Sequence, residues 1–203
     1  MVLYYILLPL AWLVFHIGFR VRCVGRENLK KIGTKGCIIA PTHISAIDPV
    51  FIVITRFWGS RMVVFAKKEL FEINAFLNWF FRCAGAVCVR GTKEELGVIE
   101  DTVRHCQNGG TLLIFPEGTR EKEGKLLQPK SGLFVIAAQA GVDVIPTRIV
   151  YGTPDGKMKL FCKVTVVYGE PIPAEQFVME SRRDTKKLRE NKQLLLDKWN
   201  ELS

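Results

Sequence analysis

The chain has 203 residues, enough for one domain with a substantial core but short for two, and 48% of them are hydrophobic. Lys and Arg outnumber Asp and Glu by 29 to 20, and the net charge of +9 favours an anionic partner. Nucleic acid is disfavoured, because no basic run interleaved with exposed aromatic residues precedes the C-terminal tail. The six cysteines form no C-x-x-C pair and lie mostly in apolar stretches, which argues against a disulfide framework or a metal site and indicates a reducing compartment.

Residues 1–19 form an apolar segment that contains no Asp, Glu, Lys or Arg. Three of its aromatic residues are of types that favour membrane interfaces: Tyr4, Tyr5 and Trp12. A helix of about eighteen residues is ~27 Å long, slightly short of a hydrocarbon core of ~30 Å, so we expect a helix, or a helix pair bent at Pro9, inserted in or across the membrane. Basic residues that follow would hold residues 20–203 on the cytoplasmic side of the cell membrane. A buried helix of a soluble protein is the alternative.

Strands are expected to alternate with helices along the rest of the chain. The predicted strands are about 21–24, 37–40, 62–66, 86–89 and 111–115, and the predicted helices are about 48–57, 75–83, 92–108, 133–140 and 184–202. Residues 142–151 and 158–168, joined by a turn at 153–157, are typical of a β-hairpin. This order predicts an α/β fold of one domain, in which a mixed, mostly parallel sheet is covered by helices.

Polar residues follow four of these strands, at the sheet edge where ligands collect in open α/β folds. They are His43 and Asp48, Lys67 and Lys68, Arg90, and finally Glu117, Thr119 and Arg120. Their convergence at one edge is the strongest functional inference that the pattern alone supports.

His43 and Asp48 lie five residues apart in the stretch 40–49, between a buried strand and the start of a helix. If the loop folds back, Asp48 can accept the ring N–H of His43 and leave the other ring nitrogen as a general base. In isolation, a loop histidine beside a helix-capping aspartate is the simpler interpretation. His16 and His105 are expected to be structural.

The segment 115–120, Phe-Pro-Glu-Gly-Thr-Arg, is more specific. Its proline and glycine favour a rigid turn after a strand, so that Glu117, Thr119 and Arg120 project from one short loop. Arg120 is suited to bidentate recognition of phosphate or carboxylate. Lys67 or Arg90 alone could be a solvated charge, but together with Arg120 they indicate a phosphate pocket.

Four blocks of the sequence resemble those of the glycerolipid acyltransferases, in the same order and spacing over about residues 20–180. The blocks are His43-x-x-x-x-Asp48, Arg90–Gly91, Phe115–Arg120 and Val144–Ile145–Pro146. The likeness is closest to the bacterial type of 1-acylglycerol-3-phosphate acyltransferase. Two departures are Thr42, where the family has Asn before the histidine, and Asn74, where a proline is usual.

The resemblance implies a glycerol-3-phosphate acyltransferase-like fold and transfer of a fatty acyl group from acyl-CoA or acyl carrier protein to the sn-2 hydroxyl of lysophosphatidate, giving phosphatidic acid. His43 would be the general base and Asp48 its orienting carboxylate, with no covalent acyl-enzyme and no metal or redox cofactor. The implied acceptor site consists of Lys67, Arg90 and Arg120 on the phosphate, with Glu117, Gly118 and Thr119 shaping it. Backbone N–H groups near Asp48 would bind the oxyanion, and Val144, Ile145 and Pro146 would line the acyl region.

Two alternatives remain open. The same chemistry could act on another lysophospholipid or a lyso-amino-lipid. A catalytically silent protein that binds anionic lipid through its basic surface is the alternative from another class. A hydrolase is disfavoured because the sequence contains no G-x-S-x-G motif for a nucleophile.

Overall fold

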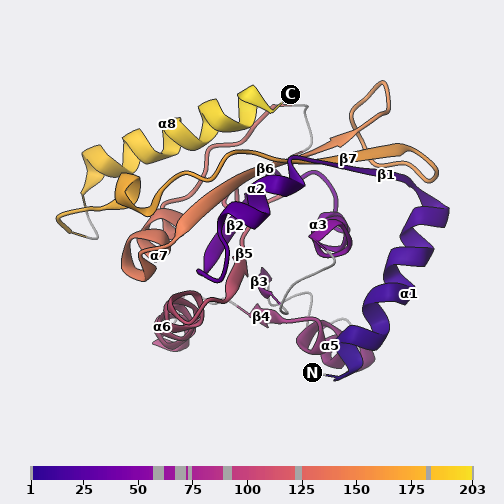
Figure 1. Ribbon diagram of the computed structural model, residues 1–203, viewed down its shortest axis with the longest axis horizontal. Helices are drawn as coiled ribbons and strands as arrows, with labels where there is room; N and C mark the ends of the chain where they lie inside the picture. Colours follow the sequence, from indigo (N-terminus) through magenta and orange to yellow (C-terminus); the bar gives the residue numbers. More distant parts are fainter. Residues whose placement is uncertain are drawn as a thin grey trace.

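A computed structural model describes residues 2–56, 62–66, 72, 75–88, 93–121, 125–181 and 184–202. Its centre is a seven-stranded sheet in the order β1-β7-β6-β2-β5-β3-β4 (Figure 1). The strands are β1 Arg20–Val24, β2 Cys37–Pro41, β3 Val63–Ala66, β4 Ala86–Cys88, β5 Thr111–Leu113, β6 Asp143–Tyr151 and β7 Lys163–Tyr168. Among these strands β6 pairs with β7 antiparallel and the other neighbours are parallel, which confirms the predicted mixed, mostly parallel sheet.

Helices cover both faces of the sheet. They are α1 Val2–Gly18, α2 Arg26–Lys31, α3 Asp48–Arg56, α5 Ala75–Cys83, α6 Lys93–Gln107, α7 Gly132–Ala140 and α8 Thr185–Glu201, with a 3-10 turn, η1, at Ala174–Phe177. Successive strand residues point to opposite faces, as Ile38 and Ile39 show: each is fully buried, but in a different core. One core lies between the sheet and helices α1 and α3, and the other lies beneath α6, α7 and α8 (Figure 1).

One edge of the sheet, which we call the carboxyl edge, collects the ends of β2, β5 and β6. Because β7 runs antiparallel to β6, it starts at this edge, where Val164 pairs with Tyr151. The edge strand β1 runs parallel to β7, with Arg20 opposite Lys163, so it starts there too. The end of α1, the loop between β6 and β7, and the loops after β2 and β5 therefore lie along one edge.

The C-terminal helix fixes the strand that leads into the His43 loop. Trp199 is fully buried, and its Nε1–H donates to the carbonyl oxygen of Ala40 in β2 at 2.9 Å. The guanidinium of Arg148 in β6 donates to the carbonyl oxygen of Trp199, also at 2.9 Å. Helix α8 thus holds two adjacent central strands from one side.

The structure differs from the predicted elements in two main respects. Residues 26–31, predicted as a polar connection, form helix α2, because Arg26 and Asn28 donate to the carbonyl oxygens of Thr55 and Tyr168. Strand β7 begins at Lys163 rather than at 158. The N-terminal segment is one helix with Pro9 inside it, which is the first of the two forms expected for it. None of the described helices combines the length and the hydropathy needed to cross a membrane.

Candidate active site

The loop after β2 is anchored by a side chain that extends the strand pairing. The N–H of Thr42 donates to the carbonyl oxygen of Thr147 at 3.1 Å, and its Oγ1 accepts the N–H of Ile149 at 3.3 Å. Thr42 is buried, so these bonds are sheltered from water. Threonine at this position therefore fixes the loop against β6 through its hydroxyl.

His43 and Asp48 meet in the structure. His43 Nδ1 lies 3.0 Å from Asp48 Oδ2, and the histidine side chain is 18% exposed while the aspartate side chain is fully buried. An Nδ1–H donated to Asp48 leaves Nε2 without a proton, which is the state that a general base requires. The loop thus folds back onto the start of α3, as the hypothesis of a base and its orienting carboxylate needs.

Asp48 accepts hydrogen bonds on both carboxylate oxygens. The N–H groups of Ile44 and Ser45 donate to Oδ2 at 2.7 and 2.8 Å. These two amides are therefore occupied, so an oxyanion contact near Asp48 would have to come from other N–H groups. Ser45 Oγ accepts the N–H of Ile47 at 3.5 Å, so Ser45 belongs to the turn that shapes the loop.

Tyr151, the last residue of β6, donates its hydroxyl to Asp48 Oδ1. The ring is buried, and burial together with the nearby charge of Asp48 raises the pKa of Tyr151 well above its usual value, so the hydroxyl stays a donor. Sequence reasoning missed this residue because it carries no motif and lies 103 positions from its partner. Its place at the end of a predicted strand was the one available signal.

The loop after β5 packs directly against His43. The Phe115 ring lies 4.2 Å from the imidazole, centroid to centroid, at an interplanar angle of 34°. The backbone of His43 is held on both sides: its N–H donates to Glu117 Oε2 at 3.3 Å, and its carbonyl oxygen accepts the N–H of Glu121 at 2.7 Å. The first and third blocks of the sequence therefore form one structural unit.

Glu117 is buried, with 3% of its surface exposed. Burial raises its pKa to about 8, against the opposing effect of the hydrogen bond from the His43 N–H. At neutral pH the carboxyl group is therefore mostly protonated. Its Oε1 has no hydrogen-bond partner within the described part of the chain, which leaves one oxygen for a further contact.

The turn at Gly118 brings in a cation that sequence reasoning did not assign. Gly118 has φ of 69°, and a Cβ built on it would lie 2.6 Å from Lys130 Nζ. The backbone of Lys130 also donates to the Pro116 carbonyl oxygen at 2.7 Å. The positive φ favours glycine here, and the absence of a Cβ leaves room for the end of the Lys130 side chain. Lys130 is exposed beside the loop, as are Thr119 and Arg120.

The other residues that the sequence singled out are placed as follows. Strands β3 and β4 end at the carboxyl edge, but Lys67 and Arg90 lie outside the described residues, as does Asn74. Val144 and Ile145 are fully buried in different cores, on opposite faces of β6, so the fourth block does not line one common acyl surface. Nowhere among the described residues do three or more His, Cys, Asp or Glu side chains gather as a metal site would require.

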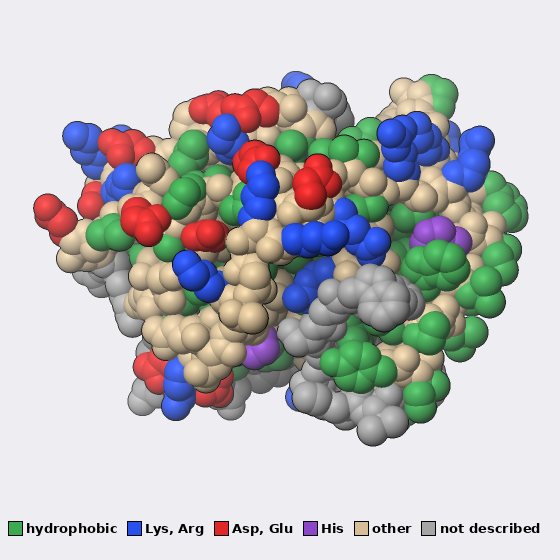
Figure 2. All heavy atoms as spheres, in the orientation of Figure 1, with side chains coloured by type: hydrophobic (Ala, Val, Ile, Leu, Met, Phe, Trp, Pro, Cys, Tyr) green, Lys and Arg blue, Asp and Glu red, His purple; other side chains and the backbone are tan. Residues whose placement is uncertain are grey.

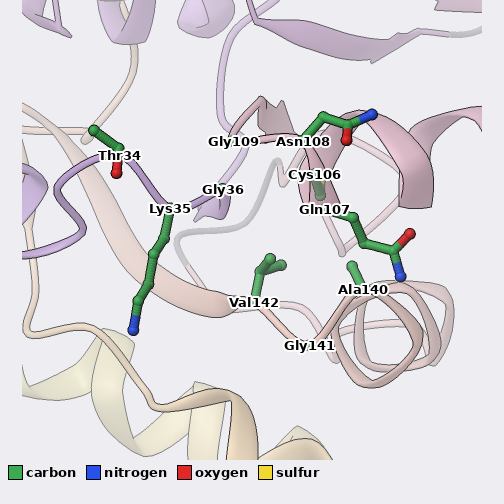
Figure 3. Close-up of a pocket in the computed structure, with 10 residues that line it drawn as sticks. All are labelled: Thr34, Lys35, Gly36, Cys106, Gln107, Asn108, Gly109, Ala140, Gly141 and Val142. Carbon is green, nitrogen blue, oxygen red and sulfur yellow. The ribbon is translucent and has the colours of Figure 1, made fainter.

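A cavity of about 390 Å³ lies at the opposite edge of the sheet (Figure 3). It is lined by the segment before β2, the turn between α6 and β5, and the turn between α7 and β6: Thr34, Lys35, Gly36, Cys106, Gln107, Asn108, Gly109, Ala140, Gly141 and Val142. Since none of the candidate catalytic or acceptor-binding residues lines it, the chemistry is placed at the carboxyl edge on the geometry of His43 and Asp48.

The comparisons with known proteins bear on the family and the fold. Residues 20–150 match the family described as Acyltransferase. The chain is 28% identical to a 1-acyl-sn-glycerol-3-phosphate acyltransferase of Chlamydomonas reinhardtii over 163 residues, which are 76% of this chain and 47% of that protein. It is also 28% identical to a protein of the same enzyme name from Borreliella burgdorferi, over 65% of this chain and 52% of that protein. This chain thus spans about half the length of these curated relatives.

Among solved structures, the fold is similar to the crystal structure of the 1-acyl-sn-glycerophosphate acyltransferase PlsC from Thermotoga maritima. The TM-score is 0.60 and the sequence identity is 26%, over 87% of this chain and 71% of that one. This likeness extends beyond the matched family region and includes the mixed, mostly parallel sheet.

Proposed function

The chain belongs to the Acyltransferase family, and from that premise we propose that it transfers a fatty acyl group from a thioester donor to the sn-2 hydroxyl of lysophosphatidate. The observation that carries the proposal is the pairing of His43 Nδ1 with the buried Asp48 carboxylate, in a loop held against the Phe115–Arg120 loop. The named relatives support lysophosphatidate as the acceptor.

The proposed reaction is a direct transfer. The oxygen of the acceptor hydroxyl attacks the thioester carbonyl carbon and forms the new ester C–O bond, while Nε2 of His43 takes the hydroxyl proton. The C–S bond of the thioester then breaks. The proton then passes from the imidazolium to the departing thiolate, so the products are phosphatidic acid and a free thiol. Asp48 holds Nδ1–H and stabilises the imidazolium between these steps. The donor is acyl-CoA or acyl-acyl carrier protein, and no metal or redox cofactor takes part.

Cations of the carboxyl edge would bind the acceptor phosphate. Arg120 and Lys130 are exposed, Lys130 lies beside Gly118, and the family resemblance adds Lys67 and Arg90. Glu117, Gly118 and Thr119 would shape the acceptor site beside these cations. A protonated Glu117 adds no negative charge beside a phosphate, which favours binding of an anionic acceptor.

The membrane association of this domain is also part of the proposal. Helix α1 buries Tyr4, Leu8 and Phe15 against the protein, while its other side exposes only apolar and aromatic residues: Tyr5, Ile6, Leu10, Trp12, Leu13, Val14 and Ile17. Such a helix can lie in one leaflet with its outer face in lipid. Arg20 and Arg22 directly after it favour the cytoplasmic face of the cell membrane.

The test supplies purified protein with radiolabelled acyl-CoA or acyl-acyl carrier protein and a panel of lyso-acceptors. Lysophosphatidate should give labelled phosphatidic acid, and His43→Ala should lower the rate by about 10²-fold or more. His105→Ala, which changes a histidine on the other side of the sheet, is the matched control. Acylation of a different lyso-lipid alone would reassign the acceptor. An undiminished rate for His43→Ala would refute the mechanism.

A further inference from the structure

The loop between β6 and β7, residues 152–162, is joined to the end of α1. The N–H of Phe161 donates to the carbonyl oxygen of Gly18 at 2.8 Å, and the N–H of Arg20 donates to that of Cys162 at 3.0 Å. A Cβ built on Gly18 would lie 3.8 Å from Leu160 Cδ1. The loop therefore continues the surface of α1 at the carboxyl edge.

Two bulky apolar side chains at this junction are exposed to solvent. Leu160 is 65% exposed and Phe161 is 63% exposed. These exposed fractions are similar to that of Ile17 in the last turn of α1, which is 68%. Together with the outer face of α1 they form one apolar surface built from two segments far apart in the sequence. Contiguous exposed apolar surface of this kind marks an interaction site.

Phe161 is held in a backbone conformation that its side chain disfavours. Its φ is 62°, and it is the one residue other than glycine with positive φ in the described part of the chain. A bulky residue in the left-handed region is strained, and such strain persists where the surroundings enforce it. An exposed phenylalanine therefore occupies a position where glycine would adopt the backbone conformation without this strain.

Cations border this apolar surface. Arg20, Arg22, Lys157 and Lys163 are exposed, and none of them makes an ion pair with a described residue. Lys159 is paired with Asp155 at 3.0 Å. Hydrophobic side chains cover the flank over α1, and Lys and Arg side chains gather beside them near the start of β1 and the β6–β7 loop (Figure 2). An apolar surface bordered by cations that make no ion pair with a described residue fits an anionic lipid surface.

We propose that Leu160 and Phe161 insert into an anionic membrane surface as a second lipid contact beside α1. The proposal rests on the membrane association included in the proposed function and adds the orientation of the molecule. Two contacts, one along α1 and one at the tip of the hairpin, fix the carboxyl edge toward the lipid. The loops of His43 and Arg120 then face the layer in which a lyso-lipid acceptor resides.

The test measures partition of the purified chain onto sedimented vesicles, with Phe161→Gly as the informative variant. Glycine removes the ring and relieves the left-handed strain, so the melting temperature should stay equal or rise while partition onto vesicles of phosphatidylglycerol and phosphatidylcholine falls by about tenfold. Phe161→Trp should keep partition within about threefold of the wild type, because tryptophan favours the interface. Val178→Gly, which removes an equally exposed residue (67%) after η1, should have no effect.

Unchanged partition of Phe161→Gly would overturn the proposal, and so would a change in oligomeric state without a change in partition, which would identify a second copy as the occupant. Acylation is measured separately on detergent-dispersed lysophosphatidate, where Phe161→Gly should keep the wild-type rate. A wild-type protein that binds vesicles through Phe161 but acylates no lysophosphatidate would refute the proposed function and leave this inference standing. If a folded Phe161→Gly variant lost both acylation and partition, that result would count against a role of Phe161 in membrane contact alone.

Discussion

At the scale of single residues, the orientation of the candidate base depends on a tyrosine outside every motif. Tyr151 occupies one oxygen of Asp48, while His43 and two backbone amides share the other. Asp48 is thereby fixed against rotation, and its direction sets that of the imidazole. Tyr151 does not reach the reacting atoms through any described contact, so we regard it as a positioning residue.

Tyr151→Phe should lower kcat by about tenfold and the free energy of unfolding by about 1–2 kcal/mol, because a buried carboxylate oxygen loses its donor. The loss of rate, measured well below the melting temperature, should exceed what the loss of stability explains, because Asp48 no longer holds the imidazole in one orientation. Tyr168→Phe removes an equally buried hydroxyl, which is bound to Thr55 at 2.9 Å. It should cost similar stability with an unchanged kcat. An equal kcat for the two variants would reduce Tyr151 to a structural role.

Glu117 should make the stability of the protein fall as pH rises. A carboxyl whose pKa is raised from 4.5 to about 8 keeps its proton in the folded state where the unfolded chain has released it, so its effect is a loss of stability between these pH values. At pH 8.5 the free energy of unfolding of Glu117→Gln, measured by denaturant unfolding, should therefore exceed that of the wild type by roughly 2–4 kcal/mol. Near pH 4.5 the two free energies should match. Glu175→Gln, which removes an exposed carboxylate, is the control. A constant difference across this range would contradict the assignment.

The candidate site could be predicted from the sequence as far as its residues are neighbours along the chain. The His43 loop and the Phe115–Arg120 loop each carry a recognisable local pattern, and the topology of parallel strands brings their ends together. Tyr151 and Lys130 could not be found in this way. Their contacts depend on the register of β6 against β2 and on the return of the chain toward Gly118, which no local pattern encodes.

At the scale of elements, α1 has two roles that the sequence showed as one apolar run. Phe15 packs against a core shared with α3, where the Phe15 and Phe51 rings meet edge to face at 5.4 Å, and Tyr4 and Leu8 are also buried. The outer face of the helix, which includes Ile6, Leu10 and Leu13, is exposed. Hydropathy alone does not separate the two faces, because both are apolar and the segment has no polar stripe. Deleting the helix would therefore remove part of the core along with the membrane contact.

Substitutions on the outer face separate these two roles. A variant carrying Ile6→Gln, Leu10→Gln and Leu13→Gln should lose membrane partition by about a hundredfold or more, because three exposed apolar side chains no longer enter lipid. Its melting temperature should change little, since exposed positions contribute little to folding. Leu8→Gln is the contrasting variant and should unfold at lower temperature. Retained partition of the triple variant, by vesicle sedimentation, would show that α1 is not the membrane contact.

Element order along the chain predicted the fold class but not the sheet order. The parallel pairing of β1 with β7 places the first strand of the chain beside the last one. A five-residue edge strand with alternating arginines carries no signal for that partner. Helix α2 was missed for a related reason: six mostly charged residues have no apolar period, and their helix is fixed by contacts to α3 and β7.

At the scale of the whole molecule, the C-terminal helix closes one core and is hydrogen-bonded to the central strands β2 and β6. Trp199 and Leu195 are the buried apolar residues on the inner face of α8, and the indole N–H of Trp199 donates to the strand that leads into the His43 loop. The loop itself has its own anchors, since Thr42 makes two hydrogen bonds to β6. Stability and catalytic geometry therefore depend on separate contacts.

Trp199→Phe tests this separation. Loss of the bond to Ala40 and the smaller ring in a close-packed core should lower the free energy of unfolding by about 2 kcal/mol, measured by urea denaturation. The rate of acyl transfer well below the melting temperature should stay within about twofold of the wild type, because the dyad keeps its own hydrogen bonds. Gln193→Ala, which removes an exposed bond to Asp197 on the same helix, should change stability by less than about 0.5 kcal/mol. A rate that falls with stability would show instead that α8 positions His43 through β2.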